Sequence, residues 1–329
     1  MLWRRLLPRV TLAASALLAS LIALELIGRA CGLWRPNHAF RYNPARGYEL
    51  IPGVDDVNSL GIRGPEVTLE HPSGLTRIVV LGDSFTYGDG VAARNTLPAE
   101  LERQLNQTLV GKFQVLNLGV PGYNTAQEVA YFRELGQRLA PDLVIIAFTL
   151  SDADMGALGS HSGAHPTLMR LKEFIKAHVG LYDFIRLQIR AGHEWSFRND
   201  PATAVWPEMY PLMLAARGEP SPGWVECARA LRAIAADCRD GGISLGLVIW
   251  PVLERLNDYD YLPLHQFVRA QATALGVPVL DLYPSFAGSD SQRFCVSEKN
   301  PHPNAAAYRH ASQVLADFLR SRPELLRSK

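Results

Sequence analysis

Between Arg77 and Leu319 the sequence alternates short apolar runs with amphipathic segments, and this alternation constrains the fold more than any other feature. Short apolar runs that end in glycine or polar residues are typical of buried strands, and apolar residues at every third or fourth position are typical of helices. The pattern predicts strands at Arg77–Leu81, Phe113–Val120, Asp142–Leu150, Ser244–Trp250 and Val277–Leu282, and helices at Pro98–Leu109, Thr125–Leu139, Glu226–Asp240, Leu262–Leu275 and Asn304–Leu319.

Strands that are apolar throughout and alternate with helices predict a parallel sheet covered on both faces. We therefore expect an α/β fold, a doubly wound, flavodoxin-like parallel sheet of about five strands, preceded by an N-terminal transmembrane helix. The expected parts are an anchor at 1–35, a juxtamembrane tether at 36–75 and the α/β domain at 76–329.

The first 35 residues favour a membrane anchor. Basic residues precede an apolar run from Val10 to Ile27, whose length as a helix is about 27 Å, close to the roughly 30 Å of a bilayer core. A cleavable signal peptide has a shorter apolar region, although Gly28-Arg29-Ala30 leaves cleavage open. The basic N-terminus and the large following domain favour an extracytoplasmic, periplasmic location, with the positive charges on the two sides of the run nearly balanced.

Two segments do not follow the alternation. The tether at 36–75 is rich in proline, glycine and asparagine, which favours turns and a chain that folds back onto the domain. About sixty residues, 156–222, are inserted between the third strand and the next helix. Insertions of this length are often lids or binding loops, and a surface excursion without a role is an equal alternative.

Net charge and residue spacing argue against two kinds of function, nucleic-acid binding and metal binding. The formal net charge is +1 and the arginines are scattered, so the chain lacks the basic surface of a nucleic-acid-binding protein. His161 and His165 are four residues apart, as metal ligands on one helix face would be, but glycines surround them and no acidic partner is near. We expect neither a metal nor a cofactor.

Polar or glycine-rich clusters follow the expected strands where a parallel sheet binds its ligands, at the carboxyl ends. Ser84 lies in the first cluster, between a strand and a helix, where backbone N–H groups can face a developing oxyanion. A serine hydroxyl needs an adjacent base to act as a nucleophile. His302, between two prolines and just before the last helix, is the best candidate among the nine histidines.

These clusters resemble three sequence blocks of the SGNH (GDSL-type) hydrolase superfamily. Gly82-Asp83-Ser84 with Gly88 is similar to the first block, Asn117 with Gly122 to the second, and His302-Pro303-Asn304 to the last, over roughly Arg77 to Leu319. The resemblance implies that Ser84 attacks an ester carbonyl and His302 acts as the base. It also implies that the backbone N–H groups of Ser84 and Gly122 are donors in an oxyanion hole.

Two positions depart from the family pattern. The third block of the family ends in Gly-x-Asn-Asp, and here Ser151 replaces the asparagine that serves as an oxyanion donor. The acid that usually precedes the histidine is replaced by Asn300, which can orient the imidazole but cannot neutralise its charge. Glu298 and Asp281 are the alternative acids.

The sequence thus predicts a serine-dependent ester hydrolase that works through an acyl-enzyme. An extracytoplasmic anchor suggests that it removes acyl or acetyl groups from an envelope or extracellular glycan, so its partners are the membrane and an acylated small-molecule or polysaccharide substrate. An O-acyltransferase on the same site and a catalytically inactive protein for glycan binding or assembly remain as alternatives.

Overall fold

The computed structural model describes residues 2–31, 40–154, 207–298 and 300–326, with residues 167, 171, 175, 179–182 and 185 between them. His161, His165 and most of the insertion lie outside the described residues. The chain divides into two compact units, which are described separately: Met1–Tyr42 with Ala164–Ala204, and Asn43–Gly163 with Val205–Lys329.

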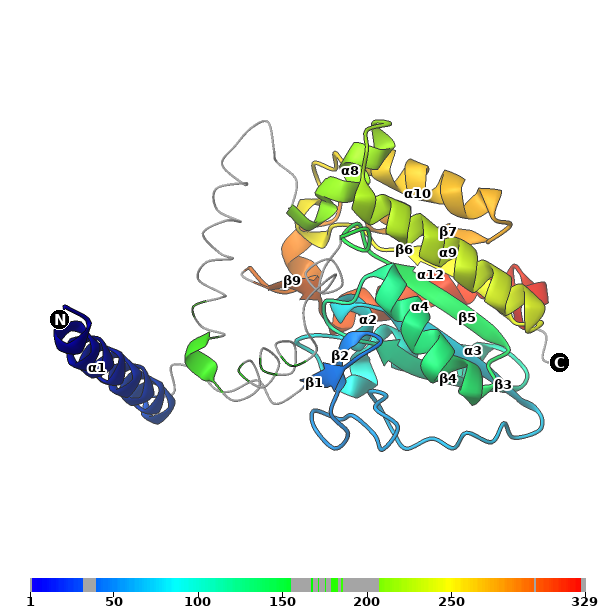
Figure 1. Ribbon diagram of the computed structural model, residues 1–329. Coiled ribbons are helices and arrows are strands. Elements are labelled where there is room, and N and C mark those ends of the chain that lie inside the picture. Colours follow the sequence, from blue (N-terminus) through cyan, green and yellow to red (C-terminus); the bar gives the residue numbers. More distant parts are fainter. Residues whose placement is uncertain are drawn as a thin grey trace. The chain divides into compact units, whose positions relative to one another are not determined.

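A five-stranded parallel sheet is the centre of the second unit (Figure 1). Its order is β4-β3-β5-β6-β7, so the first strand of the sheet lies between the second and the third, which is the flavodoxin-like order. The prediction of a doubly wound sheet is confirmed. The strands are β3 (Leu75–Gly82), β4 (Lys112–Gly119), β5 (Leu143–Phe148), β6 (Ser244–Ile249) and β7 (Val279–Asp281).

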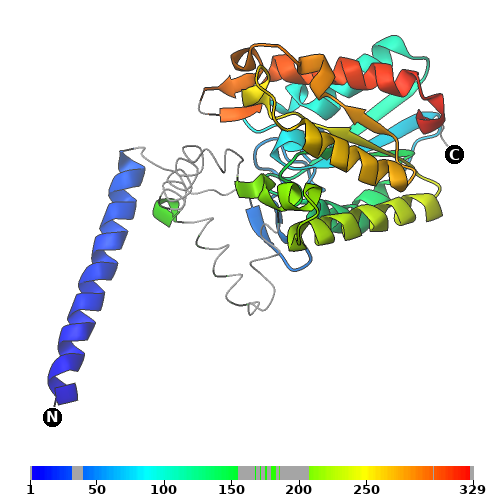
Figure 2. The ribbon, with the colours of Figure 1, turned by 90° about the horizontal axis from the view of Figure 1, so that it is seen from above.

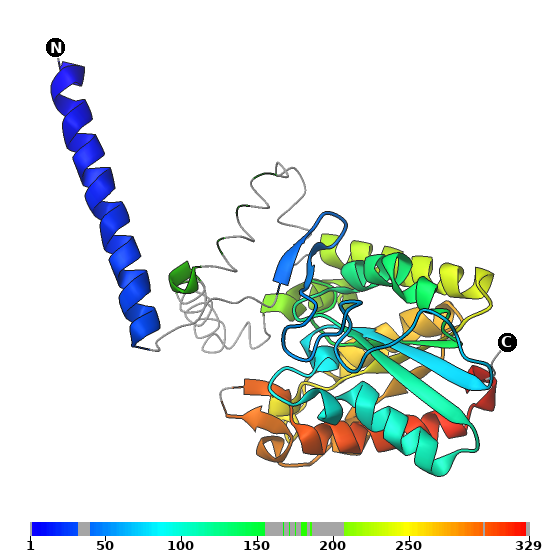
Figure 3. The same ribbon diagram turned by 90° about the horizontal axis from the view of Figure 1, so that it is seen from below.

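Helices cover both faces of this sheet. Figures 2 and 3 show α3 (Leu97–Thr108) and α12 (Ala305–Arg320) on one face, and α4 (Thr125–Glu134) and α9 (Pro222–Asp240) on the other. The helix α8 (Tyr210–Ala216) contacts both α9 and α10 (Leu262–Ala274). The shorter elements are β1 (Phe40–Asn43), β2 (Gly47–Leu50), α2 (Ser84–Tyr87), α11 (Tyr283–Phe286), β8 (Cys295–Ser297), β9 (Asn300–Pro303) and the 3₁₀ turns Ala93–Asn95, Gly136–Leu139, Pro207–Met209, Leu253–Arg255, Ser291–Arg293 and Pro323–Leu326.

Two helix boundaries differ from the sequence prediction by more than one residue. Helix α9 begins at Pro222 rather than Glu226 because the Ser221 hydroxyl caps it, accepting the N–H of Trp224 at 3.2 Å. The predicted helix over 125–139 is split, with α4 ending at Glu134 and a 3₁₀ turn following. Helix α8, which was not predicted, lies within the insertion at 156–222.

The other unit contains α1 (Leu2–Ala30), within which Arg9–Ala30 has a mean hydropathy of 2.2. By length and composition this helix can cross a membrane, although a signal sequence passes the same test. Its acidic residue, Glu25, accepts the backbone N–H groups of Gly180 and Leu181 at 3.0 and 2.8 Å and is paired with Arg29 at 2.7 Å. These partners account for a carboxylate in an otherwise apolar run.

The end of β4 lies so close to α2 that Gly119 has no room for a side chain. A Cβ at this position would be 2.2 Å from the backbone nitrogen of Tyr87. We expect Gly119→Ala to lower the free energy of unfolding by about 3 kcal/mol, the upper end of the usual cost of overpacking. Gly246→Ala in β6 is the matched control, because its Cβ would meet nothing nearer than 4.0 Å. Denaturant unfolding that gives equal stabilities for the two variants would contradict this reading of the α2–β4 contact.

Candidate active site

Ser84 is the first residue of α2, on a tight turn from strand to helix. The Asp83 side chain caps the helix by accepting the N–H of Phe85 at 2.8 Å, and Gly88, with φ of +89°, ends it. Gly82 makes the turn possible, since a Cβ there would lie 2.1 Å from the Thr86 hydroxyl oxygen. The turn therefore presents Ser84 at the carboxyl end of β3.

His302 lies in β9, which pairs with β8 in an antiparallel hairpin just before α12. Asn304 fixes the junction from both sides. Its side-chain oxygen accepts the N–H groups of Ala306 and Ala307, and its amide nitrogen donates to the carbonyls of Arg293 and Cys295, both at 2.9 Å. The loop is thus held between the start of the last helix and the chain that precedes the hairpin.

The hydroxyl of Ser84 and the imidazole of His302 are in direct contact. His302 Nε2 lies 2.9 Å from Ser84 Oγ, and His302 Nδ1 lies 2.6 Å from Asn300 Oδ1. The backbone N–H of His302 also donates to Asn300 Oδ1, at 3.1 Å, which identifies this atom as the amide oxygen. An oxygen at that position requires the proton on Nδ1 and leaves Nε2 free to accept the Ser84 proton. This geometry is the one that a serine nucleophile, its base and an orienting group require.

A family model described as GDSL-like Lipase/Acylhydrolase matches residues 80–310. The chain belongs to this family. Solved structures similar to the chain include the lipase/acylhydrolase from Enterococcus faecalis, at 15% identity and a TM-score of 0.43, where the match covers 75% of this chain and 96% of that one. Another is the esterase EstA from Pseudoalteromonas sp., at 11% identity and a TM-score of 0.44, covering 76% and 99%. No curated protein sequence matches the chain.

Membership in the GDSL-like family makes the chain an ester-hydrolysing enzyme. The three loops expected to form its oxyanion hole leave adjacent strands, because Gly82 at the end of β3 pairs with Gly119 of β4 and with Ala147 of β5. Gly122 follows β4 and has φ of +77°. Ser151 follows β5, and its hydroxyl lies 2.9 Å from that of Thr149.

The alternative acids of this GDSL-like hydrolase have other partners. Asp281 Oδ1 accepts His265 Nδ1–H at 2.8 Å and the N–H of Tyr283 at 3.0 Å. Glu298 is exposed and accepts from Gln292 at 3.3 Å. The group hydrogen-bonded to Nδ1 of His302 is the neutral amide of Asn300.

A group of buried carboxyl side chains begins at Asp83, next to Ser84, and the sequence alone did not identify it as part of the site. Thr149 Oγ1 lies 3.2 Å from Asp83 Oδ2 and 2.7 Å from Asp152 Oδ1. Both oxygens of Glu128, from α4, are buried with no hydrogen-bond partner among the described residues. One signal was available, because Glu128 is four residues before Phe132 and so falls on the apolar stripe of its helix.

Burial raises the pKa of all three carboxyl groups. The pKa of Asp83 is raised to about 6, with hydrogen bonds from Phe85 and Thr149 opposing the shift. Burial and the neighbouring Asp83 charge raise the pKa of Asp152 well above its usual value, and burial with both aspartates does the same for Glu128. Strongly shifted groups next to a nucleophile are typical of functional sites. Within the described ranges, no group of three or more His, Cys, Asp or Glu side chains is arranged to hold a metal ion.

Replacing Asn300 tests its role as the orienting group. Asn300→Asp should leave kcat unchanged or raise it, and the added carboxylate should raise the pKa of His302, moving the acidic limb of the kcat/KM profile to higher pH. Asn300→Ala should lower kcat by up to the roughly 10²–10⁴-fold that a positioned general base contributes. Steady-state ester hydrolysis across pH measures both. Full activity in Asn300→Ala would show that the imidazole is oriented by another group.

Raised carboxyl pKa values make the folded state bind more protons than the unfolded chain above about pH 4.5, so the free energy of unfolding should fall as pH rises. Glu128→Gln should flatten this dependence and give a higher Tm than the wild type at pH 8. Glu226→Gln is the control, since the hydrogen bond from Arg229 lowers the pKa of Glu226 and the group is ionised throughout this window. Thermal unfolding from pH 5 to 8 with equal slopes for the wild type and Glu128→Gln would show that Glu128 is not protonated on folding.

Proposed function

We propose that this enzyme is a serine esterase that forms an acyl-enzyme on Ser84 and removes acyl or acetyl groups from an envelope or extracellular glycan. The observation that carries the catalytic part is the 2.9 Å contact between Ser84 Oγ and His302 Nε2, with the proton of the imidazole held on Nδ1 by Asn300. This arrangement gives the hydroxyl an unprotonated nitrogen as its acceptor, which is what activates a serine.

In the proposed reaction Ser84 Oγ bonds to the ester carbonyl carbon while its proton passes to His302 Nε2. The carbonyl oxygen becomes an oxyanion, for which the N–H groups of Ser84 and Gly122 and the hydroxyl of Ser151 are the proposed donors. The carbon–oxygen bond to the alcohol then breaks, and His302 returns the proton to the leaving oxygen. In the second half, water gives a proton to His302 and bonds through its oxygen to the acyl carbon. The bond between that carbon and Ser84 Oγ then breaks, and His302 returns the proton to Oγ, which releases the carboxylic acid and regenerates Ser84.

The neutral Asn300 changes the energetics of this cycle relative to a Ser-His-Asp site. An amide oxygen orients the imidazole but gives less stabilisation to the imidazolium than a carboxylate does. The His302 ring also packs against Phe85, with ring centroids 5.5 Å apart, which restricts its rotation. Asn300 and Phe85 therefore contribute to the positioning of the base rather than to its charge.

The substrate class is inferred from the anchor. Helix α1 is long and apolar enough to span a bilayer, and the basic residues at its N-terminal end favour placing the following chain on the extracytoplasmic side. An esterase held at that face meets acylated polymers of the envelope and the extracellular space. An acylated polysaccharide, or a small acylated sugar derived from it, is therefore the proposed substrate.

Active-site labelling and turnover test the proposal. In the detergent-solubilised full chain, a fluorophosphonate probe should label wild type, and Ser84→Ala should abolish both labelling and hydrolysis of p-nitrophenyl acetate. Ser321→Ala, at an exposed hydroxyl that bonds only locally to Phe318 at the end of α12, should behave as wild type. Folded wild-type protein that is neither labelled nor active would favour the inactive binding protein.

The substrate class has its own test. An O-acetylated polysaccharide should be deacetylated with a higher kcat/KM than micellar long-chain esters or acyl thioesters, and the opposite order would overturn the glycan assignment. Transfer of the acetyl group to an added sugar, in preference to water, would identify an acyltransferase.

A further inference from the structure

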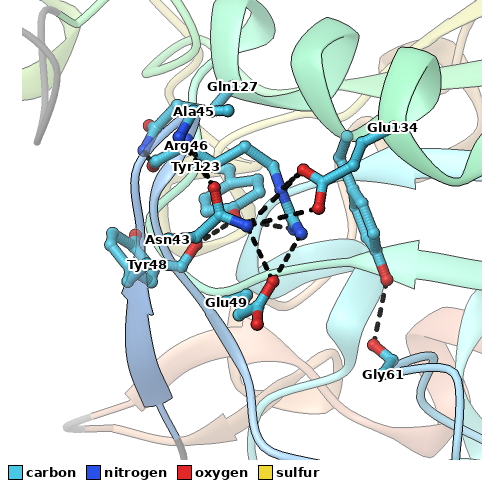
Figure 4. Close-up of polar contacts among 10 residues, drawn as sticks. Asn43, Ala45, Arg46, Tyr48, Glu49, Gly61, Tyr123, Gln127 and Glu134 are labelled. Atoms are coloured by element: carbon cyan, nitrogen blue, oxygen red, sulfur yellow. Dashed lines mark hydrogen bonds and ion pairs between the residues drawn. The ribbon is translucent and has the colours of Figure 1, made fainter.

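The chain that precedes the family match contributes contacts to the loop of Gly122. The family match begins at residue 80, and the contacts come from the turn between β1 and β2, at Asn43–Leu50 (Figure 4). The Tyr48 hydroxyl donates to the carbonyl oxygen of Pro121 at 2.8 Å, and Tyr48 is 9% exposed. The loop between β4 and α4 is thus held from outside by a segment far away in the sequence.

The Pro121 carbonyl and the Gly122 N–H belong to one peptide group. A peptide group is planar, so a hydrogen bond that fixes the direction of its C=O also fixes the direction of its N–H, which points the opposite way. A donor on the carbonyl oxygen also polarises the peptide and strengthens the N–H as a donor. Tyr48 is therefore placed to set both the aim and the strength of the Gly122 N–H.

Gly122 is fitted closely around this contact. Its φ of +77° lies in the left-handed region, and a Cβ at Gly122 would lie 2.9 Å from the Tyr48 hydroxyl oxygen. The Tyr48 ring packs edge-on against the ring of Tyr123, the next residue along the loop, with centroids 5.2 Å apart. The loop and Tyr48 leave no space between them for another side chain.

Arg46 anchors the β1–β2 turn to α4, as Figure 4 shows. Its guanidinium pairs with Glu49 at 2.8 Å and with Glu134 at 2.9 Å, and its side chain is 4% exposed. It also donates to the Tyr123 hydroxyl at 3.1 Å, and that hydroxyl donates to the backbone carbonyl of Tyr48. These bonds hold the backbone of Tyr48 as well as its side chain.

The other end of the turn is bound to the start of α4. The Gln127 side chain donates to the carbonyl of Arg46 at 2.7 Å and accepts the N–H of Asn124, while Asn124 caps the helix by accepting the N–H of Gln127. The Gly122 loop ends at this cap. The β1–β2 turn and the loop are therefore held by the same helix end.

We propose that Tyr48 is a positioning residue of the esterase, which aims and polarises the Gly122 N–H toward the oxyanion, and that Arg46 holds Tyr48 in place for this task. The inference rests on the proposed function, in which that N–H is an oxyanion donor. It extends the active site to a part of the chain outside the family match.

Tyr48→Phe removes only the hydroxyl and tests the inference. Loss of a whole oxyanion donor lowers the rate by about 10²–10³-fold, and here the donor stays but loses its orienting partner, so we expect kcat to fall by about tenfold with KM within twofold. Tyr131→Phe is the matched control. It also removes a tyrosine hydroxyl that donates to a backbone carbonyl, that of Gly61 at 2.9 Å, outside the Gly122 loop, and its kcat should stay within twofold of wild type.

An inhibitor that forms an oxyanion in the active site distinguishes the positioning role of Tyr48 from a purely structural role. The affinity for an alkyl trifluoromethyl ketone should fall in Tyr48→Phe by the same factor as kcat, while Tyr131→Phe, with a similar loss of Tm, should keep wild-type affinity. Equal effects of the two variants, or a wild-type kcat in Tyr48→Phe, would overturn the inference. Activity that survives in Ser84→Ala would instead overturn the proposed function, so the two failures are distinguishable.

Discussion

Because β3 lies between β4 and β5, the connections that leave the carboxyl ends of these neighbouring strands run to opposite faces of the sheet. Helix α3 covers one face and α4 covers the other, and ligands of open α/β sheets bind at strand ends where the connections diverge in this way. Gly82, Gly119 and Ala147 stand in register across the three strands, and the absence of side chains on the two glycines lets α2 fold back over β4. The contact between Ser84 and His302 is made at these strand ends, where the hairpin just before α12 places His302.

The raised pKa values of the buried carboxyl groups suit the negative charge that the proposed reaction creates on the oxyanion. A negative tetrahedral intermediate beside three ionised carboxylates would be strongly disfavoured in a region of low dielectric constant. Burial raises the pKa of Asp152 and of Glu128 well above the usual range, which disfavours their ionised forms, and Asp83 has two hydrogen-bond donors for its own charge. Protonated acids cost stability at high pH, and such a cost is commonly found where a site is arranged for chemistry rather than for folding.

The sheet, its helices and the pairing of Ser84 with His302 could be predicted because each has a local signal. Apolar runs mark the strands, and a polar cluster follows each strand that ends at the site. The contacts of Asn43–Leu50 had no such signal, because the turn residues of the tether fix local geometry but not what the chain packs against. The same limit applies to Asp281, which looked available at a strand end but is bonded to His265, a partner that only the packing of α10 against β7 supplies.

The two departures from the family pattern and the Tyr48 contact all affect how the charged intermediate of the proposed reaction is stabilised. Ser151 has a shorter side chain than the asparagine it replaces, so the third donor of the proposed oxyanion hole has a shorter reach, and its hydroxyl lies 2.9 Å from that of Thr149. Asn300 gives the imidazolium no compensating charge. In the proposed reaction, stabilisation of the intermediate then depends more heavily on the backbone N–H groups of Ser84 and Gly122. In the proposed reaction the Tyr48 hydroxyl, bonded to the far side of the Gly122 peptide, strengthens one of these two backbone donors, and Arg46 holds the backbone of Tyr48 through the Tyr123 hydroxyl.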